Sequence, residues 1–228
     1  VGWYRTEFDV PQFQAGKRAT ILFDGAMSHA NVYINGQKVG YWPYGYNSFH
    51  FDITKYLKPG EKNTLAVRLE NLPESSRWYP GAGLYRNVHL IVTEDAYIPV
   101  WGTYITTPSV NEKFAKVNVL TKVVLPEGAD PAKYSVETSV WNPNKQKLTA
   151  VRTSLAQMKY NNDQAEQEFV IQDPSLWSPE MPALYSAETR LYEGDKLKDV
   201  YTTPFGIRSI EIIPDKGFFL NGKRTVFK

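Results

Sequence analysis

The feature that most constrains the fold is a repeated alternation of apolar and polar residues in short segments. In residues 4–10, 49–53, 65–69 and 117–125, most apolar side chains stand at every second position. Successive side chains of a β-strand point to opposite faces, so this period places one face of each strand against a core. Proline, glycine and asparagine separate the segments, and no segment has a long helical period. The pattern predicts an all-β chain.

Two Asn-Gly dipeptides mark hairpins. Asn35-Gly36 follows an alternating run, and Asn221-Gly222 follows an apolar one. A two-residue type I′ turn needs a positive φ angle at both central residues, which asparagine and glycine tolerate best. Each dipeptide therefore predicts a tight connection between two antiparallel strands.

The strand pattern divides the chain into three parts. Residues 1–95 hold about seven short strands, which predicts a β-sandwich of the jelly-roll type. An acidic, proline-containing stretch at 93–99 is the predicted boundary, and residues 96–205 hold about seven more strands. Such a count predicts an immunoglobulin-like β-sandwich, without the disulfide of antibody domains. Residues 206–228 begin a different pattern, which we interpret as the start of a third domain.

The composition excludes several classes of site and partner. There are 26 Lys and Arg against 24 Asp and Glu, a net charge of +2 without charged blocks, so no nucleic-acid or anionic-membrane partner is predicted. The chain has no cysteine, hence no disulfide and no zinc–thiolate site. His29, His50 and His89 do not have the spacing of metal ligands, and neither a metal nor another cofactor is predicted.

The location of the protein is less constrained. No apolar run approaches the roughly 18 residues of a membrane span, and the first residues lack the pattern of a signal peptide. The chain opens directly on a predicted strand, so we expect it to come from a longer protein. The compartment is unknown, with a periplasmic or secreted location preferred to a cytoplasmic one.

The candidate binding site is the loop Ser75–Gly83. Arg77, Trp78 and Tyr79 stand together there, ahead of a Pro-Gly-Ala-Gly run that breaks regular structure. Guanidinium donors suit sugar hydroxyls, and flat aromatic faces suit the C–H face of a sugar ring. The structural alternative is that the rings only cover the end of the sandwich core. Residues 84–92 alternate between apolar and polar positions and predict one strand. Arg86, inside that strand, is interpreted as an ion-pair partner.

Seven short segments follow one another along the chain in a characteristic order. They are Gly2-Trp3-Tyr4-Arg5, residues 32–40, Phe51-Asp52-Ile53-Thr54, residues 83–88, residues 176–185, Phe205-Gly206-Ile207-Arg208 and residues 219–223. Each segment alone is a weak signal, but the set covers essentially the whole chain. Together they resemble the non-catalytic front of glycoside hydrolase family 2, the β-galactosidase and β-glucuronidase group.

The resemblance implies a galactose-binding-like jelly roll, an immunoglobulin-like domain and then a (β/α)8 barrel that carries two catalytic glutamates. In family enzymes one carboxyl group protonates the leaving oxygen and the other attacks the anomeric carbon. Residues 206–228 would be the first hairpin of a truncated barrel, so no catalytic residue is expected and this fragment should be inactive. Asn111-Glu112 matches the family's acid/base dipeptide, but it stands in a polar turn and is attributed to chance.

The resemblance also gives roles to two loops, Trp42–Asn47 and Ser75–Gly83, which narrow the sugar pocket in family members. We expect Arg77 to donate to a sugar hydroxyl or carboxylate. In one branch of the family an acidic residue at that position helps to bind a cation, so the arginine argues against that metal. The wall of the pocket is expected to be shaped by three aromatic residues, Trp78, Trp42 and Tyr44.

The chain is thus predicted to be the non-catalytic N-terminal portion of a retaining exo-glycosidase, most simply a β-galactosidase of carbohydrate metabolism. Its role would be to support and help shape the sugar pocket. Its expected partners are its own catalytic barrel and a carbohydrate substrate. Two alternatives stay open: a self-contained carbohydrate-binding module, and a structural β-sandwich array with no enzymatic role.

Overall fold

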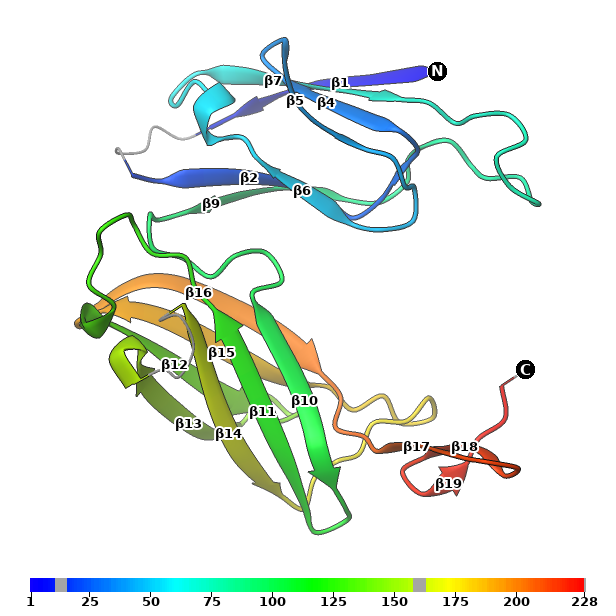
Figure 1. Ribbon diagram of the computed structural model, residues 1–228, viewed down its shortest axis with the longest axis vertical. Helices are drawn as coiled ribbons and strands as arrows, with labels where there is room; N and C mark the ends of the chain where they lie inside the picture. The colour runs from blue at the N-terminus through cyan, green and yellow to red at the C-terminus, as the bar shows by residue number, and fades with distance from the viewer. Residues whose placement is uncertain (11–15, 158–162, 228) are drawn as a thin grey trace. The chain divides into compact units, whose positions relative to one another are not determined.

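The computed structural model describes residues 1–10, 16–157 and 163–227 and separates into two compact units, Val1–Asp95 and Ala96–Lys228. Regular structure is almost entirely antiparallel strand, which confirms the all-β prediction (Figure 1). The described helices are short 3-10 turns at Thr54–Tyr56, Pro131–Lys133 and Leu155–Gln157.

The first unit is a sandwich of two main sheets (Figure 1). One sheet has four strands in the order β1 (Gly2–Asp9), β7 (Lys62–Leu69), β4 (Ala30–Ile34) and β5 (Gln37–Trp42). The other has three, in the order β6 (Phe49–Asp52), β2 (Arg18–Phe23) and β9 (Val88–Thr93). A short pair, β3 (Ala26–Met27) and β8 (Gly83–Leu84), lies outside both sheets.

The core of this unit follows from the alternation in the sequence. Every second residue of β4 and β7 is buried, and the intervening residues are partly or fully exposed. Phe23 and Phe49 stack across neighbouring strands with ring centroids 4.8 Å apart. The predicted hairpin at Asn35-Gly36 is confirmed, since the two φ angles are 51° and 79° and Ile34 pairs with Gln37.

Two of the predicted strands differ from expectation in burial. β1 was expected to bury one face, yet Tyr4 is 41% exposed and only Phe8 packs against the core, because β1 is an edge strand paired with β7 alone. Leu84–Val92 was expected to form one strand, but residues 85–87 separate β8 from β9. Leu90 lies on the same face as the buried Ile21, and at the edge of its sheet it remains 37% exposed.

The second unit contains a sandwich of seven strands in two sheets, the number expected for an immunoglobulin-like domain. The three-stranded sheet has the order β10 (Thr103–Val110), β11 (Phe114–Lys122), β14 (Gln164–Gln172). The four-stranded sheet has the order β13 (Lys147–Ser154), β12 (Tyr134–Trp141), β15 (Tyr185–Glu193), β16 (Lys196–Phe205). Phe169 on β14 and Val140 on β12 belong to the same buried cluster, so the two sheets share a core.

The last described residues form a separate three-stranded sheet of β17 (Ile210–Ile213), β18 (Gly217–Leu220) and β19 (Lys223–Arg224). The hairpin predicted at Asn221-Gly222 is confirmed by φ angles of 51° and 74° and by pairing of Leu220 with Lys223. None of these strands joins either sheet of the sandwich. Their assignment to a catalytic barrel stays a prediction.

Candidate functional site

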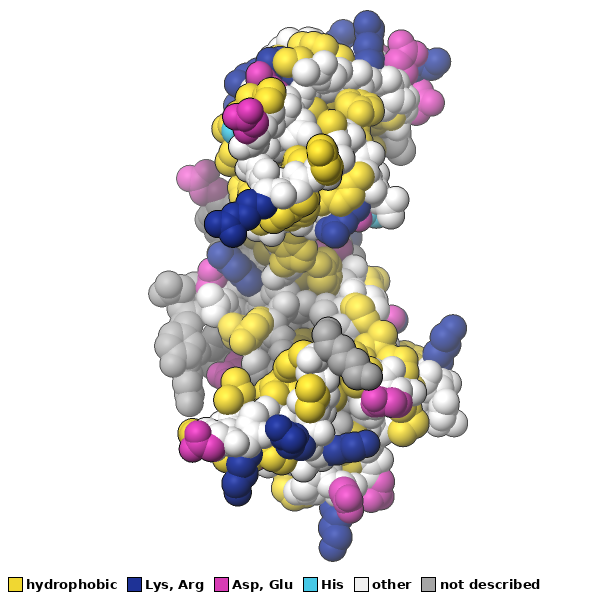
Figure 2. All heavy atoms as spheres, turned by 90° about the vertical axis from the view of Figure 1, so that its right-hand side faces the viewer, with side chains coloured by type: hydrophobic (Ala, Val, Ile, Leu, Met, Phe, Trp, Pro, Cys, Tyr) yellow, Lys and Arg dark blue, Asp and Glu magenta, His cyan; other side chains and the backbone are white. Residues whose placement is uncertain are grey.

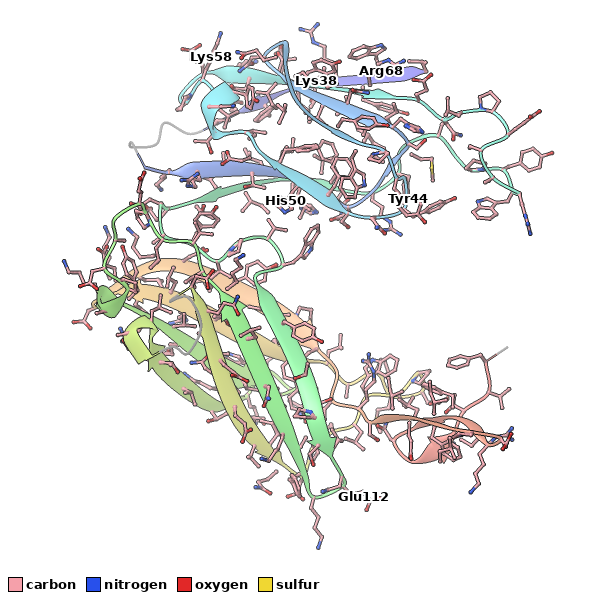
Figure 3. The ribbon with its side chains drawn as sticks, in the orientation of Figure 1. Lys38, Tyr44, His50, Lys58, Arg68 and Glu112 are labelled. Atoms are coloured by element: carbon pink, nitrogen blue, oxygen red, sulfur yellow. The ribbon has the colours of Figure 1, made fainter. Side chains whose placement is uncertain are left out.

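Aromatic side chains from two loops of the first unit meet at the candidate site. The Trp78 indole Nε1 donates a hydrogen bond to the Tyr46 hydroxyl at 2.9 Å, and their ring centroids lie 6.4 Å apart. Tyr44 meets Tyr46 edge to face at 5.5 Å. We call these three residues the loop cluster. Both loops lie at the end of the unit where Figure 3 labels Tyr44.

The loop cluster borders a hollow that a flat ligand could enter. The hollow has a volume of about 260 Å³ and is lined by Met27, Tyr46, Trp78, Tyr79, Pro80, Gly81, Ala82 and Tyr85. Trp78 is 61% exposed and Tyr44 is 53% exposed, so their ring faces are available to a ligand. Figure 2 shows hydrophobic side chains gathered on the exposed surface of this unit, with Lys and Arg side chains beside them.

Contacts from the scaffold fix the shape of both loops. The Tyr85 hydroxyl, just beyond β8, donates to the Gly45 carbonyl oxygen at 2.8 Å. Gly45 has no room for a side chain, because a Cβ there would overlap the sulfur of Met27 on β3. The Asn71 side chain donates to the Pro80 carbonyl oxygen at 3.0 Å and closes the longer loop at its base. The loop cluster is therefore held by groups on both sides.

Arg77 lies on the longer loop beside the loop cluster. Its side chain is exposed and makes no hydrogen bond or ion pair with another residue in the described part of the chain. A second hollow of about 530 Å³ is lined by residues 71–80, Arg77 among them. An unpaired guanidinium can donate to two oxygens of a ligand at once.

Trp42 does not join the loop cluster, although the sequence analysis grouped it with Tyr44. β5 extends as far as Trp42, whose partner in the adjacent strand is the buried Ala30. The two side chains therefore share the inner face, and the Trp42 ring stacks on Phe49 with centroids 5.6 Å apart. Trp42 is partly buried and packs against the core of the unit. Its contribution to a pocket wall stays a prediction.

The structure also adds residues that sequence reasoning missed. Tyr46 contacts both Tyr44 and Trp78, and Tyr85 supports the loop from below. The available signal for Tyr46 was that it lies two residues from Tyr44 in the same aromatic loop. Arg86 was expected to form an ion pair inside a strand. Instead it lies between β8 and β9, where it donates to the Asp24 backbone carbonyl oxygen at 3.3 Å and stacks on Tyr85.

The corner residues of the second unit make close contacts and hydrogen bonds with one another. Gly206 lies so close to Trp177 that a Cβ would come within 2.8 Å of it, and the Arg208 guanidinium lies 5.2 Å from the centre of the Trp177 ring. The Asn221 side chain donates to the Trp177 carbonyl oxygen at 3.0 Å and accepts from the Ser209 amide at 3.0 Å. These bonds connect the proline-rich corner with the last hairpin.

The Asn111-Glu112 dipeptide lies in the turn between β10 and β11. Figure 3 labels Glu112 at the tip of the β10–β11 turn, where the side-chain oxygen of Asn111 accepts from the Lys113 and Phe114 amides. This pattern is that of an ordinary polar turn. Within residues 1–10, 16–157 and 163–227, no group of three or more His, Asp or Glu could hold a metal ion. No helix in the same ranges is long and apolar enough to cross a membrane.

Comparison with known proteins gives two family matches that follow one another along the chain. Residues 1–94 match the model of the glycosyl hydrolases family 2 sugar binding domain. Residues 97–208 match that of glycosyl hydrolases family 2. Two curated relatives match nearly the whole chain. A β-galactosidase of Bacteroides ovatus is 40% identical over 99% of this chain and 26% of its own length. A putative β-glucuronidase of Formosa agariphila is 37% identical over 100% of this chain and 21% of its own.

Solved structures agree with the sequence relatives. A glycosyl hydrolase family 2 member from Bacteroides cellulosilyticus superimposes with a TM-score of 0.87 at 32% identity, over 97% of this chain and 28% of that one. A β-glycosidase from Bacteroides vulgatus superimposes with a TM-score of 0.84 at 31% identity, over 98% and 28%. The chain thus spans about a quarter of the length of the relatives that it matches. Across its sugar binding and second domains, the chain belongs to glycosyl hydrolases family 2.

Proposed function

We propose that the chain is the non-catalytic N-terminal portion of a retaining exo-glycosidase, and that the whole protein hydrolyses terminal β-galactosides. The observation that carries this proposal is the succession of two family domains over nearly all of the chain. The relatives are several times longer than the chain, which supports a catalytic part outside it. The name of the Bacteroides ovatus relative favours a galactoside, and that of the Formosa agariphila relative makes a glucuronide the second candidate.

We further propose that the loop cluster and Arg77 form part of the wall of the sugar pocket. The exposed faces of Trp78 and Tyr44 support a contact with the apolar face of a sugar ring. The unpaired Arg77 supports a hydrogen bond to a hydroxyl or carboxylate of the same sugar. Hydrolysis itself would need two carboxyl groups about 5 Å apart, which we assign to the part of the protein outside this chain.

The reaction is tested with nitrophenyl β-galactoside, β-glucuronide and β-mannoside on the whole protein and on the 228-residue chain. We expect the whole protein to give the highest kcat/KM with the galactoside, and the 228-residue chain to give no turnover. A preference for the glucuronide would replace the proposed substrate. Turnover by the 228-residue chain would overturn the non-catalytic assignment.

The pocket role is tested by Arg77→Ala in the whole protein. Loss of a hydrogen bond from a charged donor is expected to lower kcat/KM by about tenfold to a hundredfold. Tyr104→Ala is the matched control, because Tyr104 is 67% exposed on β10 and lies in the other unit. An unchanged kcat/KM in the Arg77 variant would show that Arg77 does not contact the sugar.

The alternative of a self-contained carbohydrate-binding module has its own signature. The exposed aromatic rings of the loop cluster are the observation in its favour. An autonomous module should bind galactose, glucuronate or mannose when the 228-residue chain is titrated by calorimetry. Saturable binding by this chain, together with a whole protein that cleaves no glycoside, would favour the module.

A further inference from the structure

The outer face of the four-stranded sheet in the first unit carries an ordered set of side chains. Residues that pair across antiparallel strands carry their side chains on the same face of the sheet. The register therefore defines rows of side chains across this face. One row consists of Trp3, Arg68, Asn31 and Tyr41, from β1, β7, β4 and β5 in turn. The next consists of Arg5, Ala66, Tyr33 and Lys38. We call these eight residues the sheet platform.

The aromatic members of the sheet platform lie close together and face outward. Trp3 and Tyr33 have ring centroids 5.7 Å apart at an angle of 36°, and Ala66, the smallest side chain in the set, stands beside Tyr33 in its row. Trp3 is 61% exposed and Tyr41 is 45% exposed. The inward neighbours on β4 and β7 are buried, so these rings are not part of the core. Exposed rings of this kind offer flat faces to a ligand.

The charged members of the sheet platform differ in whether they have an ion-pair partner. Arg68 forms an ion pair with Glu70 at 2.9 Å. Arg5 and Lys38 are exposed, stand at the two ends of the row that contains Tyr33, and make no ion pair or hydrogen bond with any described residue. Figure 3 labels Lys38 and Arg68 on the layer formed by this sheet, away from the layer of β2, β6 and β9. The free positive charge is therefore placed on both sides of an aromatic ring.

We propose that the sheet platform binds an acidic polysaccharide, a sugar chain that carries carboxylate or sulfate groups. The rings of Trp3 and Tyr33 would contact the apolar faces of sugar units, while Arg5 and Lys38 would pair with the anionic groups on either side. Charge complementarity selects this occupant over a neutral glycan, because the unpaired Lys38 stands next to Tyr33 and the unpaired Arg5 stands at the other end of the same row. The proposal goes beyond the function above, since no residue of the platform belongs to the loop cluster.

The polar members of the sheet platform add a hydrogen-bond acceptor and fix an aromatic ring. The Asn31 side chain donates to the His29 carbonyl oxygen at 3.2 Å, which leaves its own oxygen to accept from a sugar hydroxyl. His29 in turn contacts the Tyr41 hydroxyl at 2.6 Å through Nδ1, which holds that ring in position. An aromatic surface with one fixed amide and two free cations provides both the apolar and the charged contacts that an acidic sugar needs.

The test measures retention of the whole protein by polygalacturonate in affinity gel electrophoresis, with fully methyl-esterified polygalacturonate as the matched neutral polymer. We expect retention by the acidic polymer only, weakened by added salt. Trp3→Ala is expected to weaken binding by about tenfold, and the double variant Arg5→Gln/Lys38→Gln by at least as much. Dextran sulfate in a parallel gel separates sulfate from carboxylate as the recognised group.

Two controls keep the test decisive. Tyr104→Ala and Lys147→Gln remove an exposed aromatic and an exposed lysine from the second unit, and should leave retention unchanged. Thermal unfolding of each variant checks that the fold is intact. Equal retention by the methyl-esterified polymer, no retention of the whole protein, or full retention of the Trp3→Ala variant would each overturn the proposal. Loss of glycoside turnover would bear on the proposed function instead, because retention is measured without it.

Discussion

At the scale of single residues, the most connected polar side chain of the first unit is Asn63. It is completely buried, and its oxygen accepts from the Lys58 amide and from the Asn35 side chain, both at 2.8 Å. Its amide nitrogen donates to the Lys58 and Glu61 carbonyl oxygens at 3.0 and 2.9 Å. This one residue therefore joins the turn before β7 to the β4–β5 hairpin.

Replacing Asn63 by alanine should be costly. The change leaves buried donors and acceptors without partners, and we expect the free energy of unfolding to fall by about 3 kcal/mol. Urea unfolding of the wild type and the variant measures this loss of free energy. Asn144→Ala is the control, because Asn144 is exposed in the turn between β12 and β13, and its loss should change the free energy by less than about 0.5 kcal/mol. Equal effects of the two changes would contradict the role given to Asn63.

Asp199 on β16 gives the structure a pH-dependent contact. Its two carboxylate oxygens accept from the Ile98 and Val200 amides at 2.8 and 2.9 Å. Burial raises the pKa of Asp199 above its usual value, because desolvation outweighs these two hydrogen bonds. In the interval above its unfolded pKa, the native state binds more protons than the unfolded state at this site. The contribution of Asp199 to stability is therefore greatest at low pH and is lost as pH rises through the folded pKa.

The sign of this pH dependence can be measured with the variant Asp199→Asn, because an asparagine side chain does not titrate. The free energy of unfolding of the wild type minus that of the variant should increase as pH falls from about 7 towards about 4. Urea unfolding at a series of pH values gives both numbers, and the subtraction removes the titration of all other groups. A difference that is constant over this pH range would show that burial does not raise the pKa of Asp199.

At the scale of elements, the corner before β15 and the exit from β16 depend on one close approach. Gly206 packs against the Trp177 side chain, and the Trp177 amide donates to the Ile207 carbonyl oxygen at 2.8 Å. Gly206→Ala should force these two segments apart and lower the free energy of unfolding by about 2 kcal/mol. Gly81→Ala is the control, since a Cβ there would meet nothing within 4 Å. Urea unfolding gives the free energy of unfolding of both variants. An unchanged value for Gly206→Ala would mean that the two segments can move apart without loss of stability.

The same elements explain what the sequence could predict. The two Asn-Gly hairpins were predictable because positive φ angles at two consecutive residues are a local property of the chain. The separation of Trp42 from Tyr44 was not predictable, because the direction of the Trp42 side chain depends on where β5 ends. A bulge opposite Tyr33 shifts the register of β5, which turns Trp42 inward opposite Ala30. A local pattern carries no information on such a shift.

In the candidate site, too, local features were predictable from the sequence and long-range contacts were not. The grouping of Arg77 and Trp78 came from adjacency in sequence, and both lie on the exposed loop. The contact between Trp78 and Tyr46 joins residues 32 positions apart, and no period in the sequence encodes it. The exposure of β1 was missed for a similar reason, because an edge position follows from the strand order of the whole sheet. Long-range pairing therefore determined most of what the sequence left open.

At the scale of the whole molecule, the distribution of buried residues predicts how the protein unfolds. The three buried hydrophobic clusters of the described chain each draw their members from a single unit. Phe23 is fully buried in the cluster of the first unit, and Phe169 is 3% exposed in one cluster of the second. Each unit therefore has a core large enough to give its own cooperative transition.

Calorimetry of two variants tests this independence, because each serves as the control for the other. Phe23→Ala leaves a cavity in the first core and should destabilise that unit by about 4 kcal/mol, and Phe169→Ala should do the same to the second. Each change is expected to lower one transition temperature and leave the other in place. If both variants shifted one shared transition equally, the two cores would unfold as one cooperative body. In that case a substitution in either sandwich would reach the loop cluster and the sheet platform through global stability, and binding data on variants would need correction for it.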